Sequence, residues 1–286
     1  MDIIELLKAV LFGIVEGITE WLPISSTGHI ILLNDLIPLK VSENFYDLFE
    51  IIIQLGAIFA VLVLFFHKLN PFSPKKDTLQ KKNTWSLWFK VVVAVLPSAV
   101  IGLLVDEPLD TFLRNTPVLG TNLNVVVVAA ALILYGIAFI LVEKANAKKS
   151  FRISDVNAID YKTALLIGAF QCLSIIPGTS RSGATILGAI MLGVSRSAGA
   201  EFSFFLAIPT MLGASLLKLK DYLGMQMSQT ELGVLIVGCV VAFVVSLLVI
   251  KALMEFVRKH SFASFGVYRI VLGIVVLGYF ALQAVL

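Results

Sequence analysis

Long apolar stretches dominate the chain, and polar residues are confined to short segments between them or to two internal interruptions. A membrane-spanning helix needs roughly 20 consecutive, mainly apolar residues. Uninterrupted segments of this length predict six spanning helices, at about residues 46–67, 84–105, 119–142, 199–219, 231–251 and 265–285.

Two further apolar stretches predict broken helices. Residues 3–37 are interrupted by Pro23 and the polar run that follows it, and residues 161–194 by Pro177 and the glycine and hydroxyl residues after it. Proline and glycine break helices, and each remaining half is too short to span a bilayer. Non-helical backbone persists at membrane depth only where protein or a wet cavity surrounds it. We therefore expect two re-entrant helix–loop–helix hairpins.

Three spans follow each hairpin, so the second half of the chain has the opposite orientation to the first. The pattern predicts an all-α polytopic membrane protein with one membrane domain over residues 1–286. This domain is expected to contain two inverted-topology repeats, about 1–145 and 155–286, each with a re-entrant hairpin and three transmembrane helices.

Composition and charge agree with this architecture. Hydrophobic residues make up 58% of the sequence and charged residues 14%, and the mean hydropathy is +0.96, which excludes a soluble domain of this size. Basic residues concentrate in segments 68–90, 143–162 and 251–260, which the positive-inside rule assigns to the cytoplasm. Segment 106–118 then lies outside. Hairpin one enters the membrane from outside, hairpin two from the cytoplasm, and their tips meet near mid-membrane.

The first hairpin carries two carboxylates on one helix face. Glu16 and Glu20 are four residues apart, and two such groups repel each other unless a proton or a cation lies between them. Carboxylate oxygens suit Mg²⁺ or Ca²⁺, especially where a phosphate completes the coordination. The alternative is an amphipathic helix with two solvated acids.

The interruption in hairpin one combines hydroxyl groups with an imidazole. Ser25, Ser26 and Thr27 precede a short apolar helix, so free backbone N–H groups are expected there as an anion site. A plain helix N-cap is the alternative. His29 beside Ser26 would supply the minimum for an activated nucleophile; a structural histidine is the alternative.

The interruption in hairpin two repeats the arrangement with a cation. Arg181 lies between Ser180 and Ser182, and a guanidinium inside a membrane needs an anion. A phosphate suits its bidentate geometry. An ion pair with Glu16 or Glu20 alone is the alternative.

Two more residues of hairpin two are candidates for ligand binding. Thr185 lies one helical turn after Arg181 and can reach the same ligand. Gln171 occupies the position that Glu16 occupies in the first repeat, where it could orient a water or a phosphate oxygen, or only complete local hydrogen bonds.

Other phosphate-handling patterns are absent from the sequence. There is no Gly-x4-Gly-Lys-Ser/Thr loop and no His-Glu-x2-His motif. The Ser-Ser-Thr-Gly-His run resembles a block of the membrane acid phosphatases, but that family also requires a histidine where this chain has Leu187.

The two interruptions together resemble a known family. The run Glu-Gly-Ile-Thr-Glu-Trp-Leu-Pro-Ile-Ser-Ser-Thr-Gly-His from Glu16 to His29, and Pro-Gly-Thr-Ser-Arg-Ser-Gly-Ala-Thr from Pro177 to Thr185, resemble the signatures of the bacitracin-resistance type of undecaprenyl-diphosphate phosphatase. The resemblance covers essentially the whole chain, including Tyr268-Arg269.

This resemblance implies a hydrolase of the bacterial cytoplasmic membrane that depends on a divalent cation, Mg²⁺ or Ca²⁺, and opens to the outer face. Such an enzyme removes the terminal phosphate of undecaprenyl diphosphate, so that the lipid carrier returns to peptidoglycan synthesis, and it confers bacitracin resistance. The family's acidic pair corresponds to Glu16 and Glu20, its serine to Ser26, its histidine to His29 and its arginine to Arg181.

We therefore expect hydrolysis of a lipid diphosphate. Glu16 and Glu20 would hold the cation. Arg181, the Ser180 and Ser182 hydroxyls and the helix N-termini of both hairpins would hold the diphosphate. Ser26 would attack, with His29 accepting its proton or protecting the leaving oxygen. Direct attack by water, with His29 or Glu20 as the base, is the alternative chemistry. The expected partners are a polyprenyl diphosphate lipid and the bilayer, with no nucleic acid; a homo-oligomer is compatible with the sequence.

Two other function classes share some of these features. Inverted repeats with broken helices that meet at mid-membrane are typical of secondary transporters, so a transporter or flippase of a lipid-linked phosphate is the main alternative. A non-catalytic lipid-phosphate receptor is the other, but it has no need of a hydroxyl and an imidazole side by side.

Overall fold

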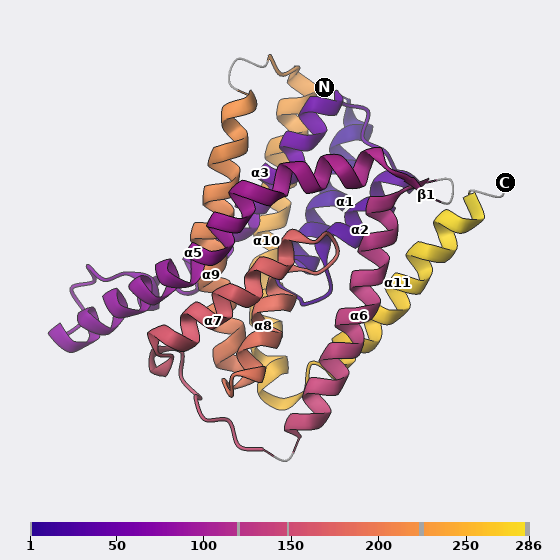
Figure 1. The fold of residues 1–286 in the computed structure, drawn as a ribbon. Coiled ribbons are helices and arrows are strands. Elements are labelled where there is room, and N and C mark those ends of the chain that lie inside the picture. The colour runs from indigo at the N-terminus through magenta and orange to yellow at the C-terminus, as the bar shows by residue number, and fades with distance from the viewer. Residues whose placement is uncertain (1, 119–120, 148, 223–225, 284–286) are drawn as a thin grey trace.

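The computed structural model describes residues 2–118, 121–147, 149–222 and 226–283, and most of them are helical (Figure 1). Within these ranges, six helices are long and apolar enough to cross a membrane. They are α3 (Glu43–Leu64), α5 (Thr78–Asn115), α6 (Leu123–Asn146), α9 (Arg196–Leu219), α10 (Gln229–Lys259) and α11 (Ala263–Gln283). The six predicted spans are thereby confirmed. Predicted span residues 119, 120, 284 and 285 lie outside the described residues, as does Lys148 of a predicted basic loop.

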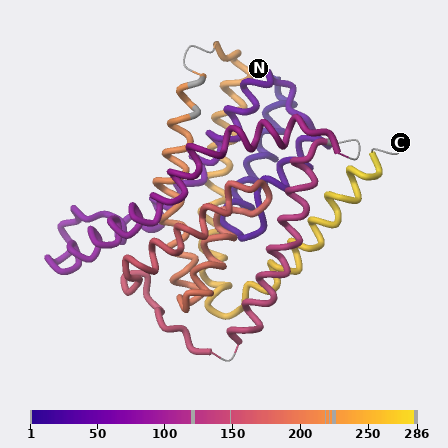
Figure 2. The backbone as a smooth tube through the Cα atoms, in the orientation of Figure 1, coloured from indigo at the N-terminus to yellow at the C-terminus, as the bar shows by residue number. Residues whose placement is uncertain are grey.

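The two broken stretches form helix pairs, as expected. The first pair is α1 (Ile3–Thr19) and α2 (Ser26–Leu36); the second is α7 (Tyr161–Gln171), continued by the 3-10 turn η2 (Cys172–Ile175), and α8 (Arg181–Met191). The second helix of each pair has 11 residues. At about 1.5 Å per residue each rises about 17 Å, well short of a roughly 30 Å bilayer core. Their turns lie in the middle of the molecule (Figure 2).

The predicted loops are shorter than the sequence indicated. Helix α5 has 38 residues and extends through Asn115, so most of segment 106–118 is helical, with Pro97 and Pro108 inside the helix. Asp77 and Gln80 form a capping box that starts α5 within the predicted loop 68–90. Helix α5 therefore continues past its apolar centre into charged residues at both ends. The remaining elements are short: α4 (Phe66–Leu69), η1 (Val156–Ala158), η3 (Lys220–Tyr222), and the hairpin of β1 (Pro117–Val118) and β2 (Thr121–Asn122).

Helices from the two halves of the chain pack against each other in a reciprocal pattern. Helix α1 packs on α10 and α7 packs on α5, while α3 contacts α9 and α6 contacts α11. Glycine allows the first of these contacts to be close. A Cβ on Gly13 would lie 2.7 Å from the Gly238 carbonyl oxygen, and one on Gly17 would lie 2.8 Å from that of Ala242. Small residues give membrane helices this backbone approach, and here they bring α1 close to α10.

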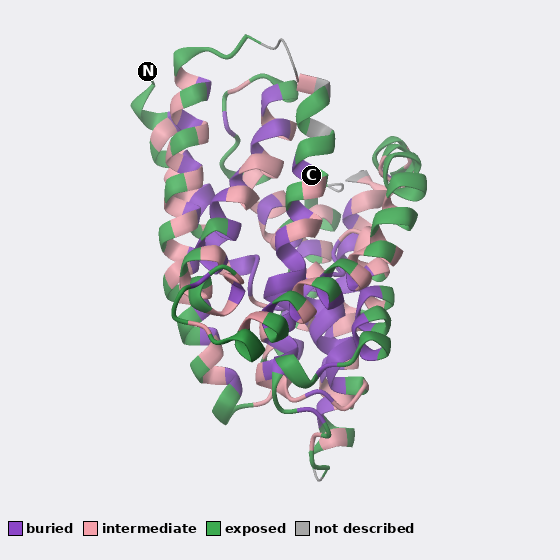
Figure 3. Cartoon of the chain, turned by 90° about the vertical axis from the view of Figure 1, so that its left-hand side faces the viewer, coloured by how far each residue is buried: buried purple, intermediate pink, exposed green. Residues whose placement is uncertain are grey.

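Buried residues are concentrated in the interior of the molecule, and exposed residues lie on its outer faces (Figure 3). The main core includes Trp21 of hairpin one, Ile186 of hairpin two, and Phe204 and Phe205 of α9, all at most 1% exposed. The outer faces of the long helices expose large apolar side chains, among them Leu103, Leu134 and Leu248 at 65–70% exposure. An apolar outer surface around a buried polar centre is the arrangement expected inside a lipid bilayer.

Candidate active site between the hairpin turns

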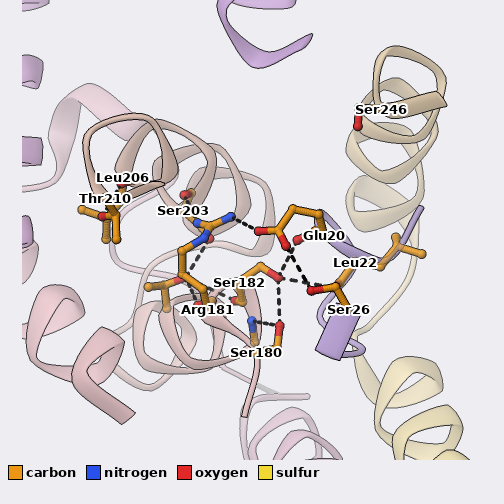
Figure 4. Close-up of polar contacts among 12 residues, drawn as sticks. Glu20, Leu22, Ser26, Ser180, Arg181, Ser182, Ser203, Leu206, Thr210 and Ser246 are labelled. Atoms are coloured by element: carbon orange, nitrogen blue, oxygen red, sulfur yellow. Dashed lines mark hydrogen bonds and ion pairs between the residues drawn. The ribbon is translucent and has the colours of Figure 1, made fainter. Parts of the chain in front are cut away.

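An ion pair joins the turns of the two hairpins. Arg181 donates from Nη2 to Glu20 Oε1 at 3.1 Å, and both side chains are about 10% exposed. The Ser182 hydroxyl lies 3.1 Å from the Glu20 carbonyl oxygen and 3.3 Å from that of Leu22. These residues point toward one another from opposite hairpins (Figure 4). The predicted meeting of the two hairpin tips is thereby confirmed.

The short helices of both hairpins begin with the same unusual backbone conformation. Ser25 and Ser180 are their N-caps, and each has a φ of 71°. A positive φ in a residue with a Cβ costs about 1–3 kcal/mol, and such strain is typical of functional sites. Free N–H groups at a helix N-terminus favour an anion.

Several polar atoms in this centre are buried without a hydrogen-bond partner among the described residues. They are Glu16 Oε1, Ser25 Oγ and Arg181 Nε. The other Arg181 nitrogens are held, because Nη1 donates to the Ser203 carbonyl oxygen at 2.9 Å while Nη2 contacts Glu20. Buried polar groups are nearly always paired, and an unpaired one costs about 1–3 kcal/mol. The orphaned atoms therefore indicate a polar ligand.

Ser26 is bonded to a carboxylate and not to the imidazole. Its hydroxyl donates to Glu20 Oε2 at 3.2 Å. His29 is held elsewhere: Nδ1 lies 2.7 Å from the Ser25 carbonyl oxygen and Nε2 lies 2.7 Å from the Tyr268 hydroxyl. A carbonyl only accepts, so Nδ1 carries the proton and Nε2 accepts from tyrosine. Ser26 and His29 therefore have separate partners, and the carboxylate of Glu20 accepts the Ser26 hydrogen bond.

The two carboxylates of α1 are buried side by side. Glu16 is 2% exposed and Glu20 is 8% exposed, which excludes the alternative of two solvated acids. Their carboxyl groups lie in hydrogen-bond contact. Two carboxylates this close need a shared proton or a cation. The described residues contain no group of three or more His, Cys, Asp or Glu side chains that could hold a metal by themselves.

Two other predicted ligand-binding residues, Ser180 and Thr185, occupy different positions in the site. The Ser180 hydroxyl accepts from the Gly183 amide at 3.2 Å and lies 3.1 Å from the Ser182 hydroxyl. Thr185 is fully buried and bonded to the Arg181 carbonyl oxygen at 2.9 Å and to Ser203 Oγ at 2.6 Å. Ser180 therefore lies at the shared centre, whereas Thr185 supports the backbone behind Arg181.

Thr27 and Gln171 do not contact the Glu20–Arg181 pair. Thr27 is exposed and lines a cavity on one side of the hairpin. Gln171 is fully buried and donates to Ser98 Oγ at 2.6 Å and to Thr210 Oγ1 at 3.2 Å. It therefore links α7 to α5 and α9, which agrees with the alternative that it completes local hydrogen bonds.

The cavity beside Thr27 measures about 890 Å³. It lies between α2, the start of α3 and the end of α5. It is therefore on the same side of the molecule as segment 106–118. Its charged lining residues are Asp35, Glu43, Asp47, Glu50 and Arg114. The cavity therefore connects one side of the molecule to the first turn of α2.

Arg269 belongs to the Tyr268-Arg269 pair that the family resemblance includes, but the sequence assigned it no role. It is fully buried in α11, and it donates to the carbonyl oxygens of both hairpin turns: Pro23 at 3.1 Å, Gly178 at 2.9 Å and Thr179 at 3.0 Å. Its guanidinium lies 5.5 Å from the Tyr135 ring centre. Apart from the resemblance, Arg269 could be recognised as an arginine inside a predicted span. Its neighbour Tyr268, which holds His29, carries no charge and had only the resemblance to mark it.

We expect Arg269→Ala to lower the stability of the purified protein strongly. It removes three charge-assisted hydrogen bonds and leaves three buried carbonyls unpaired, a loss of at least about 3 kcal/mol. Arg269→Lys should be intermediate, because one ammonium cannot reproduce the planar fork. Thermal unfolding in detergent measures both. Arg152→Ala, at an exposed arginine, is the control. Equal unfolding temperatures for the Arg269 and Arg152 variants would exclude this bracing role.

Comparison with known proteins agrees with the geometry. The profile of the family described as "Bacitracin resistance protein BacA" matches residues 9–275. The chain is 55% identical over 279 residues to an undecaprenyl-diphosphatase of Enterococcus faecalis, with 97% of this chain and 98% of the relative covered. It is 55% identical over 281 residues to undecaprenyl-diphosphatase 1 of Clostridioides difficile, with 98% of each covered. It is 52% identical to an undecaprenyl-diphosphatase of Lactiplantibacillus plantarum, with 98% of this chain and 99% of the relative covered.

Proposed function

The chain belongs to the bacitracin resistance protein BacA family, and from this premise we propose that it hydrolyses undecaprenyl diphosphate to undecaprenyl phosphate and inorganic phosphate. It is a multi-pass membrane enzyme whose product re-enters peptidoglycan synthesis and whose activity confers bacitracin resistance. The observation that carries the proposal is the set of orphaned buried atoms around the Glu20–Arg181 pair. They offer an arginine donor, a hydroxyl and a carboxylate oxygen to one polar ligand.

The diphosphate is bound where the two hairpins meet. Arg181 has a free Nε donor, and the N-termini of α2 and α8 add backbone N–H groups. Ser180 and Ser25 supply hydroxyls at the same helix ends. Phosphoryl transfer depends mainly on charge neutralisation and alignment, and this set supports both.

Ser26 attacks the terminal phosphorus. Glu20, which accepts the Ser26 hydrogen bond, takes the proton as the bond between Ser26 Oγ and phosphorus forms. The bond between that phosphorus and the bridging oxygen breaks, and the lipid monophosphate leaves. Water then attacks the phosphoserine and releases inorganic phosphate, with Glu20 returning its proton to Ser26. His29, fixed by Ser25 and Tyr268, holds the first turn of α2 in position.

Glu16 and Glu20 are the residues that would hold a divalent cation. The fit rests on the unpaired Glu16 Oε1 and on the contact between the two buried carboxyls. Mg²⁺ usually takes only one or two protein carboxylates, together with water and substrate phosphates. A bound Mg²⁺ or Ca²⁺ would neutralise charge on the diphosphate oxygens.

We expect Glu16→Gln and Glu20→Gln each to raise the Mg²⁺ or Ca²⁺ concentration needed for half-maximal activity. Glu20→Gln should also slow the reaction by roughly 10²- to 10⁴-fold, because it removes the base that accepts the Ser26 proton. Cation titrations of phosphate release measure both effects. Glu107→Gln, at an exposed acid of α5, is the control. If either variant kept the full rate at an unchanged cation requirement, the pair would not be the metal site.

The inverted repeats predicted from sequence remain part of the proposal, at about residues 1–145 and 155–286. The reciprocal packing of α1 on α10 and of α7 on α5 supports them. So does the identical φ of Ser25 and Ser180 at corresponding helix starts. A pseudo-two-fold relation of this kind would bring one turn from each half to a shared centre.

The site is proposed to open to the outer face of the bacterial cytoplasmic membrane. The 890 Å³ cavity supports this, because it reaches Thr27 from the side of segment 106–118, opposite the lysine-rich segment 68–90. Ionised groups at mid-membrane need such a wet cavity.

Cysteines placed at Ser26 and Ser180, in a background without Cys172 and Cys239, should react faster with an impermeant thiol reagent added outside. The reason is that the cavity beside Thr27 lies on the side of segment 106–118, which is proposed to face outside. Lys75→Cys, in the lysine-rich segment, is the control that should react from the cytoplasmic side. Faster labelling of the site from the cytoplasm would contradict an outward-facing centre, and equal labelling from both sides would favour an alternating-access transporter.

The proposed activity is tested with detergent-solubilised protein and a polyprenyl diphosphate. We expect inorganic phosphate and lipid monophosphate in equal amounts, and a chelator should stop their release. Family membership does not favour the transporter alternative. Lipid movement across liposomes without phosphate release would nevertheless establish that alternative and refute the phosphatase.

A further inference from the structure

A second cavity lies away from the hairpin turns. It measures about 720 Å³ and is bounded by α3, α4, α9 and α10. Its apolar lining consists of Leu64, Phe65, Ile250 and Met254, and its charged lining consists of Lys68, Glu201, Lys251, Glu255, Arg258 and Lys259. It shares no lining residue with the cavity beside Thr27. It is therefore separate from the proposed active site.

The charges of this second cavity do not balance. Lys68 pairs with Glu201 at 2.6 Å, and Lys259 pairs with Glu255 at 3.4 Å. Among the described residues, neither Lys251 nor Arg258 has a carboxylate within ion-pair distance. Four cations and two carboxylates leave an excess of two positive charges. The cavity is therefore matched to an anion.

The two unpaired cations occupy one face of α10. Lys251 and Arg258 are seven residues apart, which is about two helical turns and about 10 Å of rise. Met254 lies between them on the same face and lines the cavity. The two charges can therefore bracket a single phosphodiester above an apolar floor.

The apolar surface continues from the cavity toward the outside of the helices. On α10, Leu248 is 65% exposed and Val244 is 49% exposed; on α3, Val63 is 58% exposed. These residues lie on membrane-spanning helices, where exposed apolar side chains face lipid tails. The ligand that matches both parts has a charged head and long apolar chains.

We propose that this cavity binds the head group of an anionic phospholipid. Lys251 and Arg258 pair with its phosphodiester, and its acyl chains lie along the exposed apolar faces of α3 and α10. The Lys68–Glu201 pair forms one charged wall of the site. The site lies at the membrane edge that carries the lysine-rich segment 68–90, and basic pockets between helices at such an edge suit anionic lipids.

The test measures lipid retention by native mass spectrometry in the Arg181→Ala background, so that lipid in the diphosphate site does not contribute. Phosphatidylglycerol should be retained over phosphatidylcholine. The double variant Lys251→Gln/Arg258→Gln should lose roughly 30-fold in apparent phosphatidylglycerol affinity, since each interfacial cation contributes about 1 kcal/mol. Lys75→Gln/Lys82→Gln removes two exposed lysines from the same side and is the matched control. An equal loss in both double variants, or no loss in either, would overturn the proposal.

A second measurement does not depend on the variants. A photoreactive phosphatidylglycerol added to the wild-type protein should cross-link to α10 near Met254, and unlabelled phosphatidylglycerol should compete with it. Inorganic phosphate at millimolar concentration should leave the cross-link intact, because it lacks acyl chains. Displacement of the lipid by inorganic phosphate would identify a free-anion site and refute the lipid assignment. Cross-linking confined to other helices would refute it as well.

Discussion

Arg181→Ala is expected to abolish phosphate release from a polyprenyl diphosphate, by roughly 10³-fold or more. Arginines that stabilise phosphoryl-transfer transition states contribute about 10³- to 10⁵-fold to the rate. Arg181 is placed for this role, because its Nη2 contacts Glu20, its Nη1 contacts the Ser203 carbonyl oxygen, and its buried Nε has no partner among the described residues. Two nitrogens position the guanidinium, and the third is left for the ligand.

Arg181→Lys should be nearly as inactive as Arg181→Ala. A lysine ammonium is a point charge that cannot contact Glu20, the Ser203 carbonyl and a phosphate at the same time. Initial rates of phosphate release from purified protein measure the loss, and thermal unfolding establishes that the variants are folded. Arg152→Ala should retain the wild-type rate. Near-normal turnover in Arg181→Ala would show that the arginine only pairs with Glu20.

Ser26→Ala is expected to reduce the rate by roughly 10³-fold or more with little change in KM. A nucleophile acts on the chemical step, so its loss lowers kcat and kcat/KM together. Glu20 accepts the Ser26 hydrogen bond at 3.2 Å and Arg181 contacts the other Glu20 oxygen at 3.1 Å. The proposed nucleophile, its proposed base and Arg181 therefore form one connected group.

Ser182→Ala is the matched comparison for Ser26→Ala. The Ser182 hydroxyl is 1% exposed and faces the Glu20 and Leu22 carbonyl oxygens, so it holds the two turns together without offering a nucleophile. Its loss should cost about 1–3 kcal/mol of stability and far less rate than the loss of Ser26. Steady-state kinetics and thermal unfolding of the two variants separate these effects. A Ser26→Ala enzyme that retained most of its rate would indicate direct attack by water.

Much of the fold could be predicted from local sequence. The spans follow from the lengths of the apolar stretches. The hairpins follow from Pro23 and Pro177, because each proline interrupts the helix in which it lies. The helical extension of α5 through Asn115 was missed, because charged residues end an apolar pattern without ending a helix. The meeting of the hairpin turns was also predictable, since the sequence predicted opposite orientations for the two interrupted segments, which would place their tips at one depth.

The detailed partners within the site were not predictable in the same way. The sequence placed His29 beside Ser26 as a proton acceptor, but Tyr268 of α11 holds the ring from 239 positions away. The same applies to Gln171, whose partners Ser98 and Thr210 belong to other helices. Such contacts depend on how distant helices pack, which no local pattern records.

The most direct test of the account is hydrolysis of a polyprenyl diphosphate in water enriched in oxygen-18, with mass analysis of both products. Attack at the terminal phosphorus predicts one labelled oxygen in each released phosphate and none in the lipid monophosphate, with or without a phosphoserine intermediate. The label should appear only when Arg181 is intact. Label in the lipid monophosphate, or inorganic phosphate released at the same rate by the Arg181→Ala enzyme, would contradict phosphoryl transfer at the meeting point of the two hairpins.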